Sequence, residues 1–144
     1  MNREEGLSRW QMAKILGFHH TAIRSADFDA SLRFYTEVLG LRVRIHWGEG
    51  DQRAAMIDAG DGNYIEVFAR GVEFEHVEGT ILHFALRTDD CAAMLETIRA
   101  AGAEITMEPA AITIDSDQGP VLVKIAFFRG ADGEVIELFE NEVL

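Results

Sequence analysis

The feature that most constrains the fold is an internal repeat, because the second half of the sequence replays motifs of the first. The segment His20-Thr-Ala-Ile-Arg24 returns as His83-Phe-Ala-Leu-Arg87, with histidine, alanine and arginine in the same frame. The segment 61–68 returns as 132–139, and each copy holds a glutamate at the same offset from its first aspartate. Such self-similarity indicates two copies of one supersecondary unit.

Each repeat is predicted to contain one strand, one helix and then three strands. In the first repeat, Asp27 offers an N-cap and Gly40 a stop for the helix, and apolar residues recur at helical spacing between them. The second repeat is expected to hold a matching helix that ends before Gly102. For the first repeat the predicted elements are a strand over 18–24, a helix over 28–39, and strands over 42–47, 53–58 and 63–68.

The repeats diverge only after their helices. From Gly40 to Glu66 is 66 − 40 = 26 residues, and from Gly102 to Glu137 is 137 − 102 = 35 residues. We place the extra residues within 108–120, where two prolines predict a long loop, and long loops beside cavities are often functional. We also expect an N-terminal helical extension over 1–15 and a single domain over 16–144, with modules over 16–70 and 80–140.

Composition narrows the possible partners. The chain has 13 lysines and arginines against 25 acidic residues, a formal charge of −12, which disfavours nucleic acid and anionic membranes. The single cysteine, Cys91, cannot form an internal disulfide, and a reducing cytoplasm fits it best. No uncharged stretch approaches the roughly 20 residues needed to cross a bilayer. We therefore expect a soluble, unprocessed cytoplasmic protein that acts on a small molecule.

Two histidines and two glutamates stand at equivalent positions of the repeats: His20 and Glu66 in the first, His83 and Glu137 in the second. Pseudo-twofold symmetry between the modules could bring all four to one point. Imidazole nitrogen combined with carboxylate oxygen suits Zn, Ni, Co, Mn or Fe, and ligand type does not choose among these metals. The sequence therefore predicts one divalent metal ion in an open-sided cavity.

Strand alternation adds candidate substrate-binding residues, because residues two apart share a face. Arginines on that face could hold a carboxylate or another anionic group. The competing interpretation pairs Arg24 with Asp27, and Arg87 with Asp89 or Asp90, as structural ion pairs. His19 is expected on the opposite face from His20, and Phe127 and Phe128 in the core. The residues expected beside the four ligands are Arg24, Arg87, Tyr64, Phe68, Arg70 and Phe139.

These motifs resemble those of the vicinal oxygen chelate superfamily, which contains glyoxalase I, methylmalonyl-CoA epimerase, extradiol dioxygenases and bleomycin and fosfomycin resistance proteins. The resemblance covers about residues 16–140. It implies an α+β fold in which two tandem βαβββ modules form a cupped, open mixed β-sheet. The segments that carry it are the two His-to-Arg motifs above, Ser31-Leu-Arg-Phe-Tyr-Thr-Glu-Val-Leu-Gly-Leu41 and Asp132-Gly-Glu-Val-Ile-Glu-Leu-Phe139.

The four predicted ligands look most like those of glyoxalase I. The resemblance thus implies a metal-dependent lyase or isomerase, with Glu137 and Glu66 as its proton-transferring catalytic groups, and a homodimer. Arg24 matches an arginine that contacts glutathione in glyoxalase I, whereas Arg70 replaces a glutathione-contacting asparagine of small bacterial members. Two alternatives stay open: a non-catalytic protein that binds a small molecule or antibiotic, and an Fe(II) dioxygenase-like enzyme.

Overall fold

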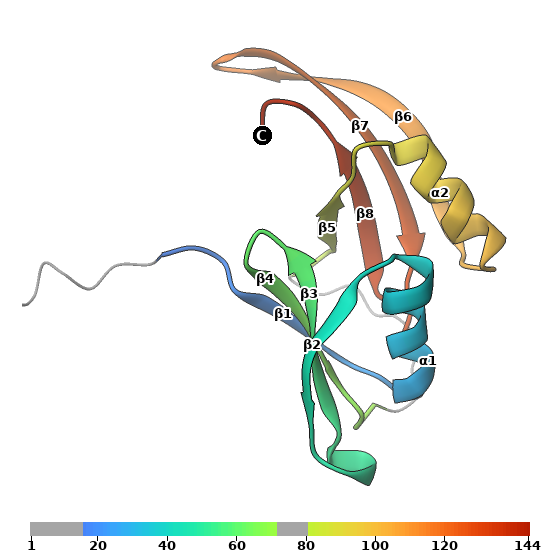
Figure 1. The fold of residues 1–144 in the computed structure, drawn as a ribbon. Coiled ribbons are helices and arrows are strands. Elements are labelled where there is room, and N and C mark those ends of the chain that lie inside the picture. Colours follow the sequence, from blue (N-terminus) through green and yellow to red (C-terminus); the bar gives the residue numbers. More distant parts are fainter. Residues whose placement is uncertain (1–15, 72–80) are drawn as a thin grey trace, which may run out of the picture.

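The computed structural model describes residues 16–71 and 81–144, so the predicted extension over 1–15 lies outside the described residues. Each half of the chain has the predicted order of one strand, one helix and three strands (Figure 1). The first module contains β1 (His20–Arg24), α1 (Phe28–Arg33), the π-helical turn η1 (Phe34–Val38), β2 (Arg42–Trp47), the short helix η2 (Gly50–Gln52), β3 (Ala54–Gly60) and β4 (Asn63–Phe68). The second contains β5 (Phe84–Arg87), α2 (Cys91–Ala100), β6 (Ile105–Ser116), β7 (Gly119–Arg129) and β8 (Val135–Glu140).

The two modules have identical sheet topology. Strand order is β1-β4-β3-β2 in one sheet and β5-β8-β7-β6 in the other. In each sheet the first strand pairs in parallel with the last strand, and the remaining pairs are antiparallel. Figure 1 shows one helix on the same side of each sheet, and among the described residues no helix covers the opposite sheet faces. The predicted α+β fold of two βαβββ modules is confirmed.

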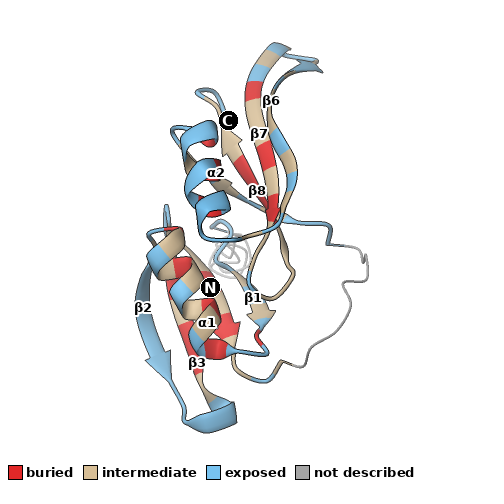
Figure 2. Ribbon diagram, turned by 90° about the vertical axis from the view of Figure 1, so that its right-hand side faces the viewer, coloured by how far each residue is buried: buried red, intermediate tan, exposed pale blue. Residues whose placement is uncertain are grey.

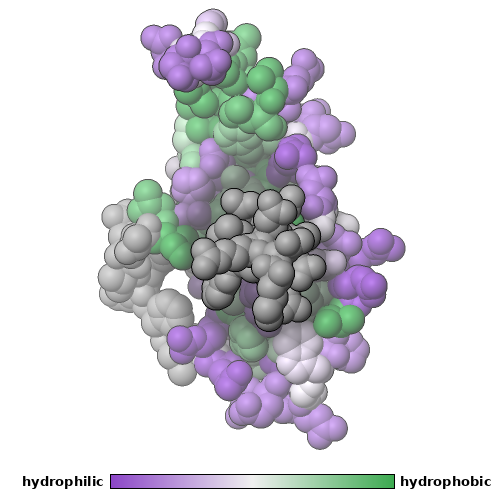
Figure 3. Space-filling view, turned by 90° about the vertical axis from the view of Figure 1, so that its left-hand side faces the viewer, coloured by the Kyte–Doolittle hydropathy of each residue, from purple (hydrophilic) through white to green (hydrophobic). Residues whose placement is uncertain are grey.

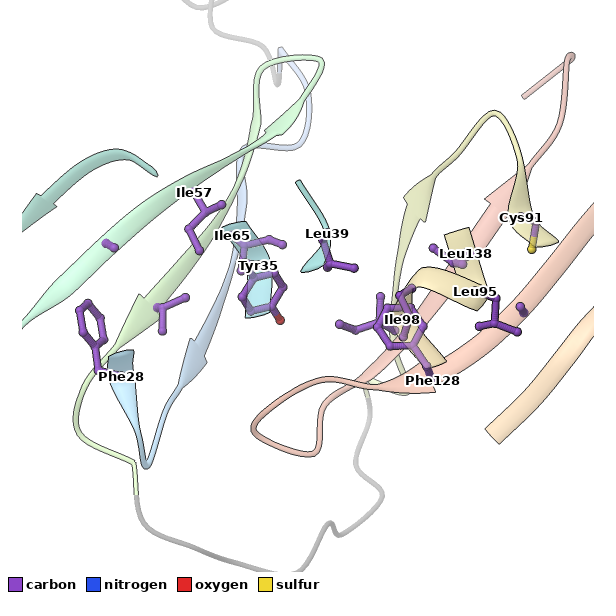
Figure 4. Close-up of a cluster of buried hydrophobic side chains, with 14 residues drawn as sticks. Phe28, Tyr35, Leu39, Ile57, Ile65, Cys91, Leu95, Ile98, Phe128 and Leu138 are labelled. Carbon is purple, nitrogen blue, oxygen red and sulfur yellow. The ribbon is translucent and has the colours of Figure 1, made fainter. Parts of the chain in front are cut away.

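A continuous apolar core lies between the helices and the sheets (Figures 2 and 4). On β4 and β8 core-facing side chains alternate with side chains on the other face of the sheet, so Ile65 and Val67 in one module correspond to Ile136 and Leu138 in the other. Burying each such side chain contributes on the order of 2 kcal/mol. Because every second residue points into this core, the residues between them must face the uncovered side of each sheet.

Both helices begin after an aspartate N-cap, which the sequence predicts for the first helix. Asp27 accepts a hydrogen bond from the Ala30 N–H at 3.0 Å, and Asp90 accepts one from the Ala93 N–H at 2.9 Å. The predicted helix over 28–39 differs in one respect, because after Arg33 it continues as the wider turn η1. This turn carries Tyr35, whose side chain is fully buried and points toward the second module.

The segment 108–120 is not a loop, which corrects the prediction. It belongs to a long hairpin in which β6 and β7 stay paired as far as Ser116 and Gly119. The two prolines that suggested a loop occupy positions that strands tolerate. Pro109 lies at a register shift in the edge strand β6, and Pro120 is the second residue of β7.

A hydrogen-bonded cluster, which we call the intermodule network, joins α1 and η1 to the turn between β7 and β8. It consists of Ser31, Tyr35, Asp132 and Glu134. Ser31 donates to Asp132, and the Tyr35 hydroxyl donates to Glu134 Oε1 at 2.5 Å. The Asp132 N–H holds the other oxygen of Glu134 at 2.8 Å. The network therefore ties the first module to the strand that carries Glu137.

Gly130 suits this arrangement, since a Cβ there would overlap the Glu134 carboxylate that the network holds in place. Burial raises the pKa of the Glu134 carboxyl, and burial together with the Glu134 charge raises the pKa of Tyr35 well above its usual value.

In the part of the chain that the structure describes, no helix has both the length and the apolar character needed to traverse a bilayer.

Candidate metal site

In the first module, His20 and Glu66 lie side by side on the sheet face that points away from the core. Their strands β1 and β4 are parallel neighbours, with Ala22 opposite Glu66. His20 Nε2 lies 3.2 Å from Glu66 Oε2, and 40% of the His20 side chain is exposed. The neighbours of Glu66 in sequence, Ile65 and Val67, fill the core. The alternation of β4 therefore directs the carboxylate outward.

The second module repeats this geometry with His83 and Glu137. His83 Nε2 lies 2.9 Å from Glu137 Oε2, and 35% of the His83 side chain is exposed. His83 immediately precedes β5, and Glu137 lies on β8 between the core residues Ile136 and Leu138. The symmetry seen in the sequence thus extends to the relative placement of the side chains.

The donor atoms in each pair suit a divalent metal. Two ligand atoms bound about 2.1 Å from one ion at a right angle lie about 3.0 Å apart, and both observed N–O distances are close to that value. The Nδ1 atoms of His19 and His20 lie 2.9 Å apart. A proton held on His20 Nδ1 and donated to His19 leaves Nε2 unprotonated, which is the form of imidazole that binds metals.

One chain does not bring the four predicted ligands together. Within residues 16–71 and 81–144, no group of three or more His, Cys, Asp or Glu side chains is arranged to hold a metal ion. The reason is that β1 and β5 stand at the edges of separate sheets, so each module presents its own pair. Each pair supplies two donors, and a complete coordination shell needs more.

The two predicted substrate-binding arginines, Arg87 and Arg24, have different surroundings. Arg87 Nη1 forms an ion pair with Asp61 Oδ2 at 2.7 Å, so the ion-pair interpretation applies but with a partner other than Asp89 or Asp90. Asp61 stands at the β3–β4 turn in a left-handed conformation with φ of 53°. Arg24 instead lines a cavity of about 320 Å³ between the modules, together with Ala22 and His83.

The aromatic candidates share the ligand face, as strand alternation predicts. Tyr64 and Phe68 flank Glu66 at two-residue spacing on β4, and Phe139 has the same relation to Glu137 on β8. The guanidinium of Arg70 lies 5.7 Å from the Phe68 ring centre. Aromatic and cationic groups therefore stand close to the first pair.

Sequence reasoning missed two contacts. Phe127 was expected in the core with Phe128, but its ring stands 5.1 Å from the His83 ring, edge to face. Its register position opposite Glu137 explains this, and the alternation of β7 could have revealed it. His19 contacts His20 although adjacent strand residues face opposite ways, because His19 precedes the start of β1.

Comparisons with known proteins agree with the fold. The family model of the Glyoxalase/Bleomycin resistance protein/Dioxygenase superfamily matches residues 17–138. A Vibrio parahaemolyticus protein named probable lactoylglutathione lyase is 35% identical over 132 residues, which cover 85% of this chain and 89% of that protein. The lactoylglutathione lyase of Haemophilus influenzae is 34% identical, with coverage of 85% and 91%.

Among solved structures, glyoxalase I from Zea mays superimposes with a TM-score of 0.67 at 25% identity. The match covers 86% of this chain and 46% of the maize chain. This chain therefore spans about half the length of that structural relative, whereas it spans most of the two bacterial relatives.

Proposed function

The chain belongs to the Glyoxalase/Bleomycin resistance protein/Dioxygenase superfamily, and on this premise we propose that it is a metal-dependent lyase or isomerase of the glyoxalase I type. Its substrate would be a small molecule with two neighbouring oxygens. The observation that carries the proposal is the matched geometry of His20–Glu66 and His83–Glu137 on equivalent faces of two modules. The names of the bacterial relatives support the same type of reaction.

We further propose that the active unit is a homodimer with one metal ion per chain. Each pair offers two donors and is partly exposed, and the two pairs of one chain do not converge. Divalent metals of this type take at least four ligands. The first-module pair of one copy facing the second-module pair of another would supply two imidazoles and two carboxylates.

In this site a bound divalent ion would polarise the substrate oxygens and make the neighbouring carbon-bound proton acidic. Glu137 is almost completely buried, so its carboxylate is shielded from bulk water. We assign Glu137 the role of the base that takes this proton and returns it to the adjacent carbon, with Glu66 as its symmetric counterpart.

The surrounding side chains would hold the rest of the substrate. Arg24 lines the cavity next to His83 and would bind an anionic group. Asp61 holds Arg87 at the last residue of β5, the strand that His83 precedes. Other residues proposed to contact substrate are Arg70, Tyr64, Phe68 and Phe139.

Metal analysis of the purified protein tests this proposal. We expect about one divalent ion per chain, lost in His20→Ala and in His83→Ala but retained in His46→Ala, a histidine on β2 that belongs to neither pair. Glu66→Gln and Glu137→Gln should reduce isomerisation of the adduct of methylglyoxal and glutathione. A metal-free protein that binds a flat aromatic antibiotic would instead support sequestration. Oxygen consumption by the iron-loaded protein would support dioxygenase chemistry.

A mixing experiment tests the shared site. If each site takes one pair from each copy, a heterodimer of His20→Ala and His83→Ala chains contains one intact site and one doubly altered site. Random exchange of the two variants should then restore about a quarter of the wild-type metal content. If every site were built within one chain, mixing would restore none.

A further inference from the structure

The hairpin formed by β6 and β7 extends beyond the rest of its sheet. β8 pairs with β7 only over residues 124–129, whereas β6 continues its pairing with β7 to Ser116 and Gly119. Residues 111–123 therefore form a two-stranded projection, which we call the hairpin arm (Figure 1). An isolated two-stranded hairpin is marginally stable in water, so such an arm is expected to gain stability from further contacts.

One face of this hairpin continues the face that carries His83 and Glu137. Phe127 stands opposite Glu137 in the register and contacts the His83 ring. Because alternate residues and their cross-strand partners share a face, the pairing fixes which other side chains lie there. We call this set the inward face: Phe127, Ile125, Val123 and Val121 on β7, and Met107, Ala110, Ile112 and Ile114 on β6.

The inward face is entirely apolar. None of its eight side chains carries a charge or a hydrogen-bonding group, whereas Thr113, Asp115 and Lys124 stand on the other face of the same strands. Figure 3, which views the molecule from the uncovered side of the sheets, shows hydrophobic surface below a hydrophilic tip. A carboxylate or peptide group placed against this face would lose its water without gaining a partner.

The inward face is also long. Phe127 and Val121 are six residues apart, which corresponds to about 20 Å along a strand. A three-carbon substrate anchored at His83 and Glu137 would contact only its beginning. Ile114, near the far end, keeps 40% of its surface exposed. Val123 is buried and the other members of the face are at least partly exposed, so an apolar face of this length that begins at a ligand pair suits a ligand with an extended apolar part.

We propose that the inward face binds an aliphatic or aromatic group that the substrate carries beyond its two vicinal oxygens. This inference rests on the proposed function, since the metal must anchor the oxygens. The substrate class is then an α-hydroxycarbonyl compound or a 2-oxoaldehyde adduct with a long apolar substituent. A conjugate whose distal end is a peptide with several carboxylates would fit this face poorly.

Alkyl hydroxamates test the inference, because they present two vicinal oxygens to a metal and can be extended one methylene at a time. Calorimetric titration of the zinc-loaded protein should show binding that tightens by up to about fourfold per methylene beyond acetohydroxamate. Ile112→Ser should weaken the binding of decanohydroxamate on the order of tenfold and leave the affinity for acetohydroxamate unchanged. Leu122→Ser is the matched control, because Leu122 is 73% exposed and stands on the opposite face.

The outcomes separate the inference from the proposed function. If all the hydroxamates bound with the same affinity whatever their chain length, the inference alone would be overturned. Absence of any acetohydroxamate binding would refute the metal site and, with it, both proposals. If Ile112→Ser lowered the sedimentation coefficient to that of a monomer and weakened the binding of acetohydroxamate and decanohydroxamate equally, a second copy would occupy the face and the inference would be wrong.

Discussion

Removing the Tyr35 hydroxyl from the intermodule network tests how much this network contributes to the stability of the protein. Tyr35→Phe keeps the buried ring and deletes the hydroxyl that donates to Glu134 Oε1 at 2.5 Å. A hydrogen bond to a charged group contributes about 1.5–3 kcal/mol. The Asp132 N–H still holds the other carboxylate oxygen, so we expect the free energy of unfolding to fall by about 2 kcal/mol.

The loss should depend on pH, because burial already raises the pKa of Glu134. A carboxyl whose pKa is higher in the folded protein favours folding fully below its unfolded pKa of about 4.5, and this contribution is lost as pH rises through the folded value. Without the tyrosine donor the folded pKa rises further. The stability difference between the variant and the wild type should therefore be larger at pH 7 than near pH 4.5.

Urea denaturation followed by circular dichroism at the two pH values measures this difference. Tyr64→Phe is the matched control, since Tyr64 is the other of the two tyrosines and lies on the exposed face of β4. A Tyr35→Phe variant as stable as the Tyr64→Phe variant would refute the reasoning. So would a stability difference that grows as the solution is acidified.

Other positions give independent predictions. Gly130→Ala should lower the free energy of unfolding by about 1–3 kcal/mol in urea denaturation, since its Cβ would displace the Glu134 carboxylate. Asp90→Ala removes the N-cap of α2 and should cost about 1 kcal/mol, and an Asp90→Asn variant should keep most of that stability. The Cys91 thiol is fully buried and its burial raises its pKa, so a thiol reagent at pH 8 should modify it far more slowly in the folded protein than in urea.

Much of the fold could be predicted because local signals agreed with one another. The N-cap at Asp27, the helix stops at Gly40 and Gly102, and the apolar alternation in β4 and β8 each have a local cause. The repeat added the equivalence of the two halves. The prolines at 109 and 120 misled the prediction of a loop, because an edge strand with register shifts accommodates proline and sequence alone does not show which strand is at an edge.

The relation between the modules could not be predicted from the repeat. A repeat predicts that two units are alike, but it carries no information about how one packs on the other. That packing depends on Ser31 and Tyr35, and the corresponding positions of α2 hold Met94 and Ile98, which cannot make the same hydrogen bonds. The repeat predicts the four ligands as a set, but it does not indicate whether one chain or two supply them to an ion, and the described residues of one chain do not bring them together.

The position of β6 at the border of its sheet affects how the protein behaves at high concentration. An edge strand of 12 residues offers unpaired backbone N–H and C=O groups, and another chain could pair with them and start an aggregate. Two register shifts and Pro109 interrupt that row, and Glu108 and Asp115 place negative charge along it. With a net charge of −12 on every copy, mutual repulsion adds to this protection. Colloidal stability is thus built into the same strand that carries half of the apolar surface.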